Sequence, residues 1–208
     1  MNNWDNMLEL AGFATFALAS SITPGPNNMM MTTLGASVGF RRGIPALLGI
    51  AFGFAVMIFL ISLGIGRVII DAGSTLTAAM RLGGLLIIAW MAWQIATAPV
   101  EPSEVEEDSP ATGQRFGAFF GAAAFQWVNP KAWIICASAI TAYLDQTQNI
   151  LPQAVAFAST FVFASFAGCL PWLAAGTLVG RFLQGSRARL FNVVMAALLV
   201  VSMIPVML

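Results

Sequence analysis

The chain has 208 residues, of which 59% are hydrophobic and 9% are charged, and its formal net charge at pH 7 is zero. A soluble domain carries about 25% charged residues. So few charged side chains cannot cover a surface that faces water, so the composition excludes a soluble globular domain and predicts an all-α integral membrane protein. A neutral chain also offers no basic surface for a nucleic-acid partner.

Histidine is absent, and the two cysteines, Cys136 and Cys169, lie far apart within apolar stretches. Histidine is the commonest general base and the commonest transition-metal ligand. Redox relays and structural zinc sites use closely spaced cysteines, as in C-x-x-C. The sequence therefore predicts that the protein is not an enzyme and that it has no catalytic residue, no metal site and no cofactor.

Six apolar stretches are long enough to cross a bilayer, which takes about 20 helical residues. We expect them at 7–34, 44–64, 76–96, 116–143, 151–180 and 190–208, with the first connecting loop at the glycines and arginines of 35–43. Residues 98–115 are rich in proline, glutamate and aspartate, as solvated linkers are. The chain therefore divides into a first three-helix repeat (1–97), an acidic cytoplasmic linker (98–115) and a second three-helix repeat (116–208).

The first span is interrupted at its centre by Pro24, Gly25 and Pro26. Proline removes an amide donor, and its ring clashes with the preceding helical turn. In lipid, the carbonyl and amide groups freed by such a break each cost several kcal/mol unless protein or a water-filled cavity satisfies them. We therefore expect the break to face the inside of the molecule, where broken helices build the substrate sites of many transporters.

The fourth span has a matching interruption at Asn129-Pro130-Lys131. Each break falls in the first span of its half, and each half then supplies two more spans. Because three is an odd number, the two halves must cross the membrane in opposite directions. The sequence therefore predicts a 3+3 inverted-topology repeat with broken helices 1 and 4, whose breaks meet near the membrane midplane.

The residues at the two breaks are the candidates for substrate binding. They are Pro24, Gly25, Pro26, Asn27, Asn28, Gln126, Asn129, Pro130 and Lys131. The half-helix that begins near Asn27 presents amides with partial positive charge, which suit an anion. Asparagine and glutamine side chains both donate and accept hydrogen bonds. This set suits a zwitterion, although the asparagines could also serve only as helix caps.

Lys131 lies near the centre of the fourth span, where a charged lysine costs about 2.5–3.5 kcal/mol. No Asp or Glu lies deep within any expected span. Three roles are therefore open. Lys131 caps carbonyl groups exposed by a proline break, or it loses its proton in apolar surroundings, or it keeps its charge for a carboxylate that arrives with the substrate.

Orientation is predicted from the lysines and arginines of short loops, which gather on the cytoplasmic side. The first, third and fifth loops hold Arg41, Arg42, Arg115, Arg181, Arg187 and Arg189, whereas the two ends of the chain hold none. We therefore expect both termini on the periplasmic side of a bacterial inner membrane.

Three stretches carry a family resemblance: Thr23-Pro24-Gly25-Pro26-Asn27, the glycines Gly35 and Gly39, and Asn129-Pro130-Lys131. In these motifs, and in its six expected spans, the chain resembles the LysE/RhtB family of amino-acid exporters. The stretches 22–28 and 93–97 are similar to those of cysteine/O-acetylserine exporters within that family. The resemblance implies a secondary transporter that exports a small neutral amino acid or derivative, of the cysteine/O-acetylserine or threonine/homoserine type, driven by the proton motive force.

Two other functions remain as alternatives. An exporter of inorganic cations would need carboxylate-rich or thiolate-rich spans, and a non-transporting scaffold would not need polar breaks. The oligomeric state stays open, with a homodimer as one alternative.

Overall fold

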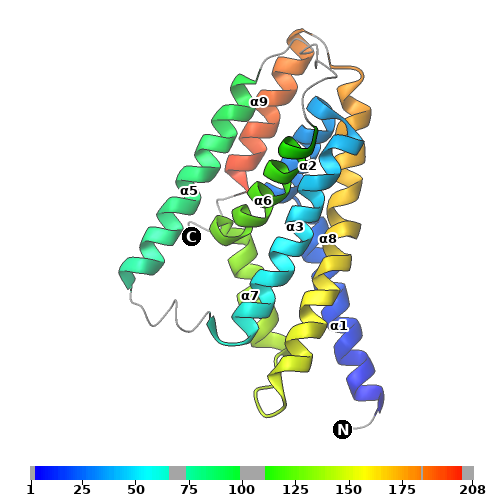
Figure 1. Cartoon of the computed structure of the whole chain (residues 1–208), viewed down its shortest axis with the longest axis vertical. Helices are drawn as coiled ribbons and strands as arrows, with labels where there is room; N and C mark the ends of the chain where they lie inside the picture. Colours follow the sequence, from blue (N-terminus) through cyan, green and yellow to red (C-terminus); the bar gives the residue numbers. More distant parts are fainter. Residues whose placement is uncertain (1–2, 66–73, 99–110, 184, 203–208) are drawn as a thin grey trace.

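The computed structural model describes residues 3–65, 74–98, 111–183 and 185–202, and within these ranges all regular structure is helical. The helices are α1 (Asn3–Ile22), α2 (Pro26–Val38), α3 (Phe40–Ser62), α5 (Ser74–Thr97), α6 (Ala111–Val128), α7 (Pro130–Tyr143), α8 (Ile150–Gly180) and α9 (Ser186–Val201). They form an elongated bundle with the N-terminal end of α1 at one end (Figure 1). Most of the acidic linker and the second loop, with Arg67 and Asp71, lie outside the described residues.

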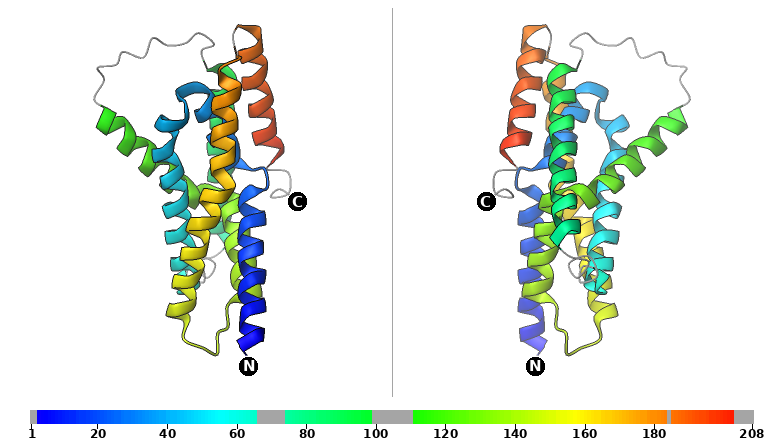
Figure 2. Two further views of the ribbon diagram at one scale, coloured as in Figure 1. Left: turned by 90° about the vertical axis from the view of Figure 1, so that its right-hand side faces the viewer. Right: turned by 90° about the vertical axis from the view of Figure 1, so that its left-hand side faces the viewer.

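The long helix α8 runs through the bundle and packs against α1, α2 and α3 (Figures 1 and 2). Helix α3 also packs against α6, and α5 packs against α9. By length and composition, α3 and α8 could each cross a membrane, with mean hydropathies of 2.6 and 1.7. Shorter apolar helical stretches occupy Leu10–Ile22 and Leu82–Thr97.

Glycines set the closest helix contacts, as small residues do in membrane bundles. Gly35 of α2 lies against the backbone of Leu173 and Thr177 on α8, and Gly176 of α8 lies against the backbone of Thr32 on α2. On the other side of the bundle, Gly53 of α3 lies against the backbone of Ala123 on α6. A Cβ atom at any of these glycines would overlap backbone, so the spacing of these helices depends on them.

The expected loop at 35–43 is wrong, because only Gly39 separates α2 from α3. Gly39 has a φ of 81°, a left-handed value that glycine adopts without strain, and the chain reverses there within one residue. Gly43 is helical and packs against the Leu173 side chain. Arg41 and Arg42 consequently lie in the first turn of α3 rather than in a loop.

Other helices also begin earlier than the expected spans. Helix α1 begins at Asn3 rather than at 7. Helix α6 begins at Ala111, five residues before the expected start of the fourth span. Helix α9 begins at Ser186 rather than at 190 and ends at Val201. The last expected residues of the sixth span, 203–208, lie outside the described part of the chain.

Candidate functional site

The predicted interruption of the first span is confirmed: α1 ends at Ile22 and α2 begins at Pro26. Gly25 is the N-cap of α2 in an extended conformation, with φ −174° and ψ −176°, and Pro26 occupies the first helical turn. Proline is favoured there because its missing N–H would have no helical partner. Among the described residues no side chain caps the N-terminus of α2, so its first amides are available to an acceptor from elsewhere.

Side chains from α2 and α8 satisfy the carbonyls at the C-terminal end of α1. The Asn28 Nδ2 atom donates to the carbonyls of Ser21, Ile22 and Thr23 at 3.0–3.2 Å. The Trp172 Nε1 atom of α8 donates to the Ile22 carbonyl at 3.3 Å. Asn28 is 2% exposed, so it acts as a buried cap on the C-terminal end of α1.

Lys131 reaches this same break from α7. Its Nζ atom donates to the carbonyl of Thr23 and, at 3.4 Å, to that of Pro24. Of the three roles open to Lys131, the contact with exposed carbonyls is therefore present in the structure. The contact joins residues 108 positions apart in the sequence. A lysine of the second half therefore donates hydrogen bonds to carbonyls exposed by the break in the first half.

The second predicted interruption is also confirmed, between α6 and α7 at Asn129. Asn129 has an extended backbone, and its side chain accepts a hydrogen bond of 3.1 Å from the Lys131 amide, as a helix N-cap does. Pro130 again fills the first helical turn. Trp133 donates to the Trp127 carbonyl at 2.8 Å, and the two indole rings pack edge to face beside the break, with centroids 6.2 Å apart.

The two breaks meet through amide side chains. Asn27 Nδ2 donates to Gln126 Oε1 at 2.9 Å, and Gln126 Nε2 donates back to Asn27 Oδ1 at 3.1 Å. The Asn129 Nδ2 atom also donates to Asn27 Oδ1, at 3.3 Å. Gln126 is 0% and Asn129 is 1% exposed. These bonds therefore form a buried polar link between the halves of the chain.

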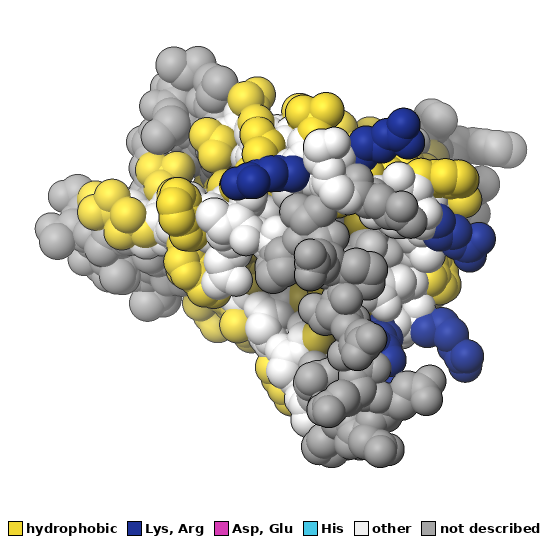
Figure 3. Space-filling view, turned by 90° about the horizontal axis from the view of Figure 1, so that it is seen from above, with side chains coloured by type: hydrophobic (Ala, Val, Ile, Leu, Met, Phe, Trp, Pro, Cys, Tyr) yellow, Lys and Arg dark blue, Asp and Glu magenta, His cyan; other side chains and the backbone are white. Residues whose placement is uncertain are grey.

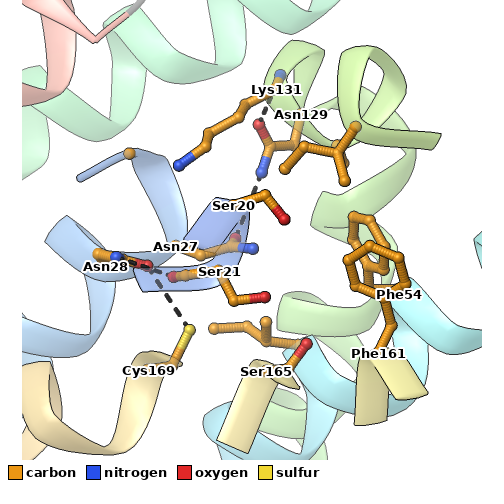
Figure 4. Close-up of a pocket in the computed structure, with 14 residues that line it drawn as sticks. Ser20, Ser21, Asn27, Asn28, Phe54, Asn129, Lys131, Phe161, Ser165 and Cys169 are labelled. Atoms are coloured by element: carbon orange, nitrogen blue, oxygen red, sulfur yellow. Dashed lines mark hydrogen bonds between the residues drawn. The ribbon is translucent and has the colours of Figure 1, made fainter. Parts of the chain in front are cut away.

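A small cavity lies at this junction (Figure 4). Its volume is about 30 Å³, which is room for about two water molecules. Polar groups at the breaks line one part of it, and α3, α7 and α8 supply most of the apolar wall. The lining residues are Ser20, Ser21, Gly25, Asn27, Asn28, Ile50, Phe54, Asn129, Lys131, Ala132, Ile135, Phe161, Ser165 and Cys169. Among these, Lys131 is the charged side chain.

Comparison with known proteins identifies the chain. The family model of the LysE type translocator matches residues 18–204. The chain belongs to this family. The expected resemblance is thereby confirmed, and LysE type translocators are membrane proteins that act as transporters.

Curated relatives of this translocator are efflux proteins. The chain is 30% identical over 192 residues to the cysteine/O-acetylserine efflux protein of Escherichia coli strain K12, covering 92% of this chain and 93% of the relative. The proteins of the same name from Escherichia coli O9:H4 (strain HS) and Shigella flexneri serotype 5b (strain 8401) match equally well. No solved structure matches the chain.

The structure brings five of the nine candidate residues of this translocator to the cavity wall: Gly25, Asn27, Asn28, Asn129 and Lys131. Pro24, Pro26, Gln126 and Pro130 shape or link the breaks without lining it. Sequence reasoning missed the lining residues that lie outside the breaks, including Ser20, Ser21, Ser165 and Cys169. On α8 the available signal was spacing, because Phe161, Ser165 and Cys169 recur every four residues along one helix face.

Proposed function

We propose that this translocator exports small neutral amino acids or their derivatives across the bacterial inner membrane. The observation that carries the proposal is the contact of Lys131 with the Thr23 carbonyl beside the cavity at the two breaks. Lys131 is half-buried and bonds to neutral carbonyls, with no anionic partner among the described residues, and a substrate carboxylate can supply one. The efflux proteins of Escherichia coli and Shigella at 30% identity are named for cysteine and O-acetylserine, which are amino acids of this kind.

Both charges of a zwitterion find partners at the breaks. The carboxylate replaces the carbonyls as the acceptor for Lys131 Nζ, and it also faces the uncapped amides of α2. When Lys131 turns to the carboxylate, the carbonyls of Thr23 and Pro24 become free to accept the substrate ammonium. The exchange keeps the number of hydrogen bonds nearly constant, so binding leaves few polar groups buried without a partner.

Export then requires movement of the walls, because the cavity of about 30 Å³ is too small for an amino acid. We propose alternating access, in which one three-helix repeat rocks against the other around the paired breaks. The packing of the described helices supports a six-span inverted repeat. Helix α3 contacts the broken pair of the second half at α6, and α8 contacts the broken pair of the first half at α1 and α2.

The distribution of arginines supports an orientation with the termini in the periplasm. Arg41 and Arg42 begin α3, Arg181 follows α8, and Arg187 and Arg189 begin α9. Basic side chains surround the end of the molecule seen in Figure 3, where the described residues show no acidic ones. We assign this end to the cytoplasm by the positive-inside rule. Energy for export comes from the proton motive force in this proposal.

Uptake of radiolabelled amino acids into inverted membrane vesicles tests the function, because export from the cell becomes uptake into such vesicles. Vesicles that contain the protein should accumulate cysteine, O-acetylserine or a similar small neutral amino acid. A pH gradient should increase the accumulation, and an uncoupler should abolish it. A panel of small neutral amino acids that gives no uptake above that of vesicles without the protein would refute the proposal.

A further inference from the structure

Ser165 is a buried polar residue on the cavity face of α8. It is 5% exposed and lines the cavity. Phe161 lies one turn before it and Cys169 one turn after it, and both also line the cavity. In Figure 4, Ser165 lies at the opposite end of the hollow from Lys131. Its side chain therefore faces the part of the cavity that is farthest from the cation.

The Ser165 hydroxyl differs from its neighbours on α8. Ser159 and Thr160 each donate to the carbonyl four residues earlier at 2.8 Å, and Thr177 does so at 2.9 Å. Hydroxyls in helices commonly satisfy themselves in this way. Within the part of the chain that the structure describes, the Ser165 hydroxyl makes no such bond. Because no fully buried side-chain oxygen or nitrogen there lacks a hydrogen-bond partner, the Ser165 oxygen opens onto the cavity that the residue lines.

Cys169, by comparison, is already engaged. Its Sγ atom donates to Asn28 Oδ1 at 3.6 Å, which ties it to the cap of α1. Close to both residues, Gly168 lies against Ser21 of α1 so tightly that a Cβ atom would come within 2.6 Å of the Ser21 Cβ. This contact fixes the distance of α8 from the first break and therefore the depth of the hollow at Ser165.

We infer that the Ser165 hydroxyl binds the side chain of the exported amino acid and selects small neutral side chains that carry a hydrogen-bonding atom. The inference rests on the proposed function and adds a side-chain subsite to it. With the substrate carboxylate at Lys131, the side chain extends toward Ser165. A hydroxyl, thiol or ester oxygen there can form a hydrogen bond with the serine hydroxyl, which opens onto the cavity.

The walls around the subsite limit the size of the side chain. Phe54 and Phe161 pack with ring centroids 4.7 Å apart and form an apolar wall. No acidic side chain lines the described cavity, so a cationic side chain would lose its hydration without a counter-charge. The subsite therefore favours serine-sized or cysteine-sized side chains over long, branched or charged ones.

The test compares pairs of substrates that differ in one hydrogen-bonding atom: serine against alanine, and cysteine against 2-aminobutyrate. Initial uptake into inverted vesicles is measured for the wild type and for Ser165→Ala. Wild-type protein should prefer serine and cysteine over their apolar counterparts. Ser165→Ala should reduce both preference ratios by about two- to ten-fold, as expected for one hydrogen bond, while alanine uptake stays near its wild-type rate.

Ser159→Ala is the matched control, because Ser159 lies on the same helix, is exposed and bonds to the Val155 carbonyl. It should leave both ratios unchanged. Because each ratio is measured within one vesicle preparation, it does not depend on how much protein is inserted. If Ser165→Ala inserts poorly, Ser165→Cys supplies a second reading, since a thiol is a weaker hydrogen-bonding group and should give intermediate ratios.

The possible outcomes distinguish failure of the Ser165 subsite from failure of the proposed export function. Wild-type uptake with ratios that Ser165→Ala leaves unchanged would overturn the subsite and keep the exporter. An equal loss of serine and alanine uptake in a well-inserted variant would also overturn it, because it would indicate a structural role. Absence of uptake by the wild type for the whole panel would refute the exporter, and the subsite with it.

Discussion

Asn27 and Gln126 exchange two hydrogen bonds, of 2.9 and 3.1 Å, between residues 99 positions apart in the sequence. Asn27 lies in the first turn of α2, after the first break, and Gln126 lies in the last turn of α6, before the second. Gln126 also donates to the Ala122 carbonyl at 2.9 Å. The pair therefore joins the two breaks directly, and losing these hydrogen bonds should destabilise the contact between the two halves of the molecule.

Replacing Gln126 with leucine should lower the stability of the protein by about 1–3 kcal/mol, because the Asn27 amide would lose its partner in a largely buried setting. Thermal unfolding of the purified protein in detergent would measure the change. The double variant Asn27→Leu plus Gln126→Leu should be more stable than the sum of the single effects predicts, since it leaves fewer unpaired amides. Strictly additive effects would show that the pair contributes no coupling.

Lys131 should be essential for export but not for insertion. Lys131→Met keeps most of the side-chain length and removes the charge. Uptake into inverted vesicles should fall by about 10- to 100-fold, as expected for the loss of a hydrogen bond to a charged group. Arg187→Met removes an exposed cation at the start of α9 and should leave uptake largely unchanged. Equal uptake by the wild type and Lys131→Met would show that Lys131 does not bind the substrate.

Gly25 should matter because of the space that it leaves for Lys131. A Cβ atom at Gly25 would lie 2.7 Å from Lys131 Cδ and 2.9 Å from Nζ. The backbone of Gly25 is extended, with a φ of −174°, and alanine adopts this conformation without strain. Gly25→Ala should therefore displace the flexible lysine with little effect on stability, and it should raise the substrate concentration needed for half-maximal uptake by several-fold.

The measurement for Gly25→Ala combines a saturation curve in vesicles with thermal unfolding in detergent. A large drop in unfolding temperature would show that the glycine serves the fold and not the position of the lysine. An unchanged saturation curve would show that displacing the Lys131 ammonium group does not affect substrate binding.

The two breaks could be predicted from the sequence because their chemistry is local. A proline removes its own amide and clashes with its own preceding turn, although Pro45 and Pro171 still lie inside α3 and α8. The breaks are marked by prolines next to residues that suit a non-helical backbone: Gly25 lies between Pro24 and Pro26, and Asn129 precedes Pro130. The reversal at Gly39 could not be located in the same way. Gly35, Gly39 and Gly43 look alike in sequence, but one makes the turn and the other two make room for α8.

The residues of the candidate site also differ in whether the sequence alone can identify them. Asn27, Asn28, Asn129 and Lys131 stand beside the breaks and could be selected from sequence as polar residues in apolar spans. Ser165 could not, because small hydroxyl residues are common in membrane helices and usually bond to their own backbone. Only the packing of α8 against the breaks shows which of its hydroxyl groups faces the cavity.

The turn between α7 and α8 gives a prediction about pH. Asp145 accepts hydrogen bonds from the Thr147 hydroxyl at 2.6 Å, the Thr147 amide at 2.8 Å and the Gln148 side chain at 2.7 Å. These bonds favour the carboxylate, first of all the one from the Thr147 hydroxyl, and they hold the pKa of Asp145 below its usual range.

Because the pKa is lower in the folded state, the carboxylate stabilises the fold above the unfolded pKa, which is about 3.9, and this contribution is lost as the pH falls through the lowered pKa. Asp145→Asn should therefore unfold at a lower temperature than the wild type at pH 7. The difference should persist at pH 5 and shrink below about pH 4. A difference that grew on acidification would contradict the assigned hydrogen bonds.

Two glycines should respond in opposite directions to the same substitution. Gly176 of α8 lies against α2, and a Cβ atom there would come within 2.8 Å of the Thr32 carbonyl carbon and 2.9 Å of its Cα. Gly176→Ala must push backbone away from backbone, so it should destabilise the protein by about 1–3 kcal/mol.

Gly117 of α6 has no described atom within 4 Å of an added Cβ. Gly117→Ala should therefore be neutral or stabilising by up to about 1 kcal/mol, because alanine favours a helix over glycine. Thermal unfolding of both variants under the same detergent conditions would measure the contrast. Similar unfolding temperatures for the two variants would show that the contact of α2 with α8 is looser than the structure has it.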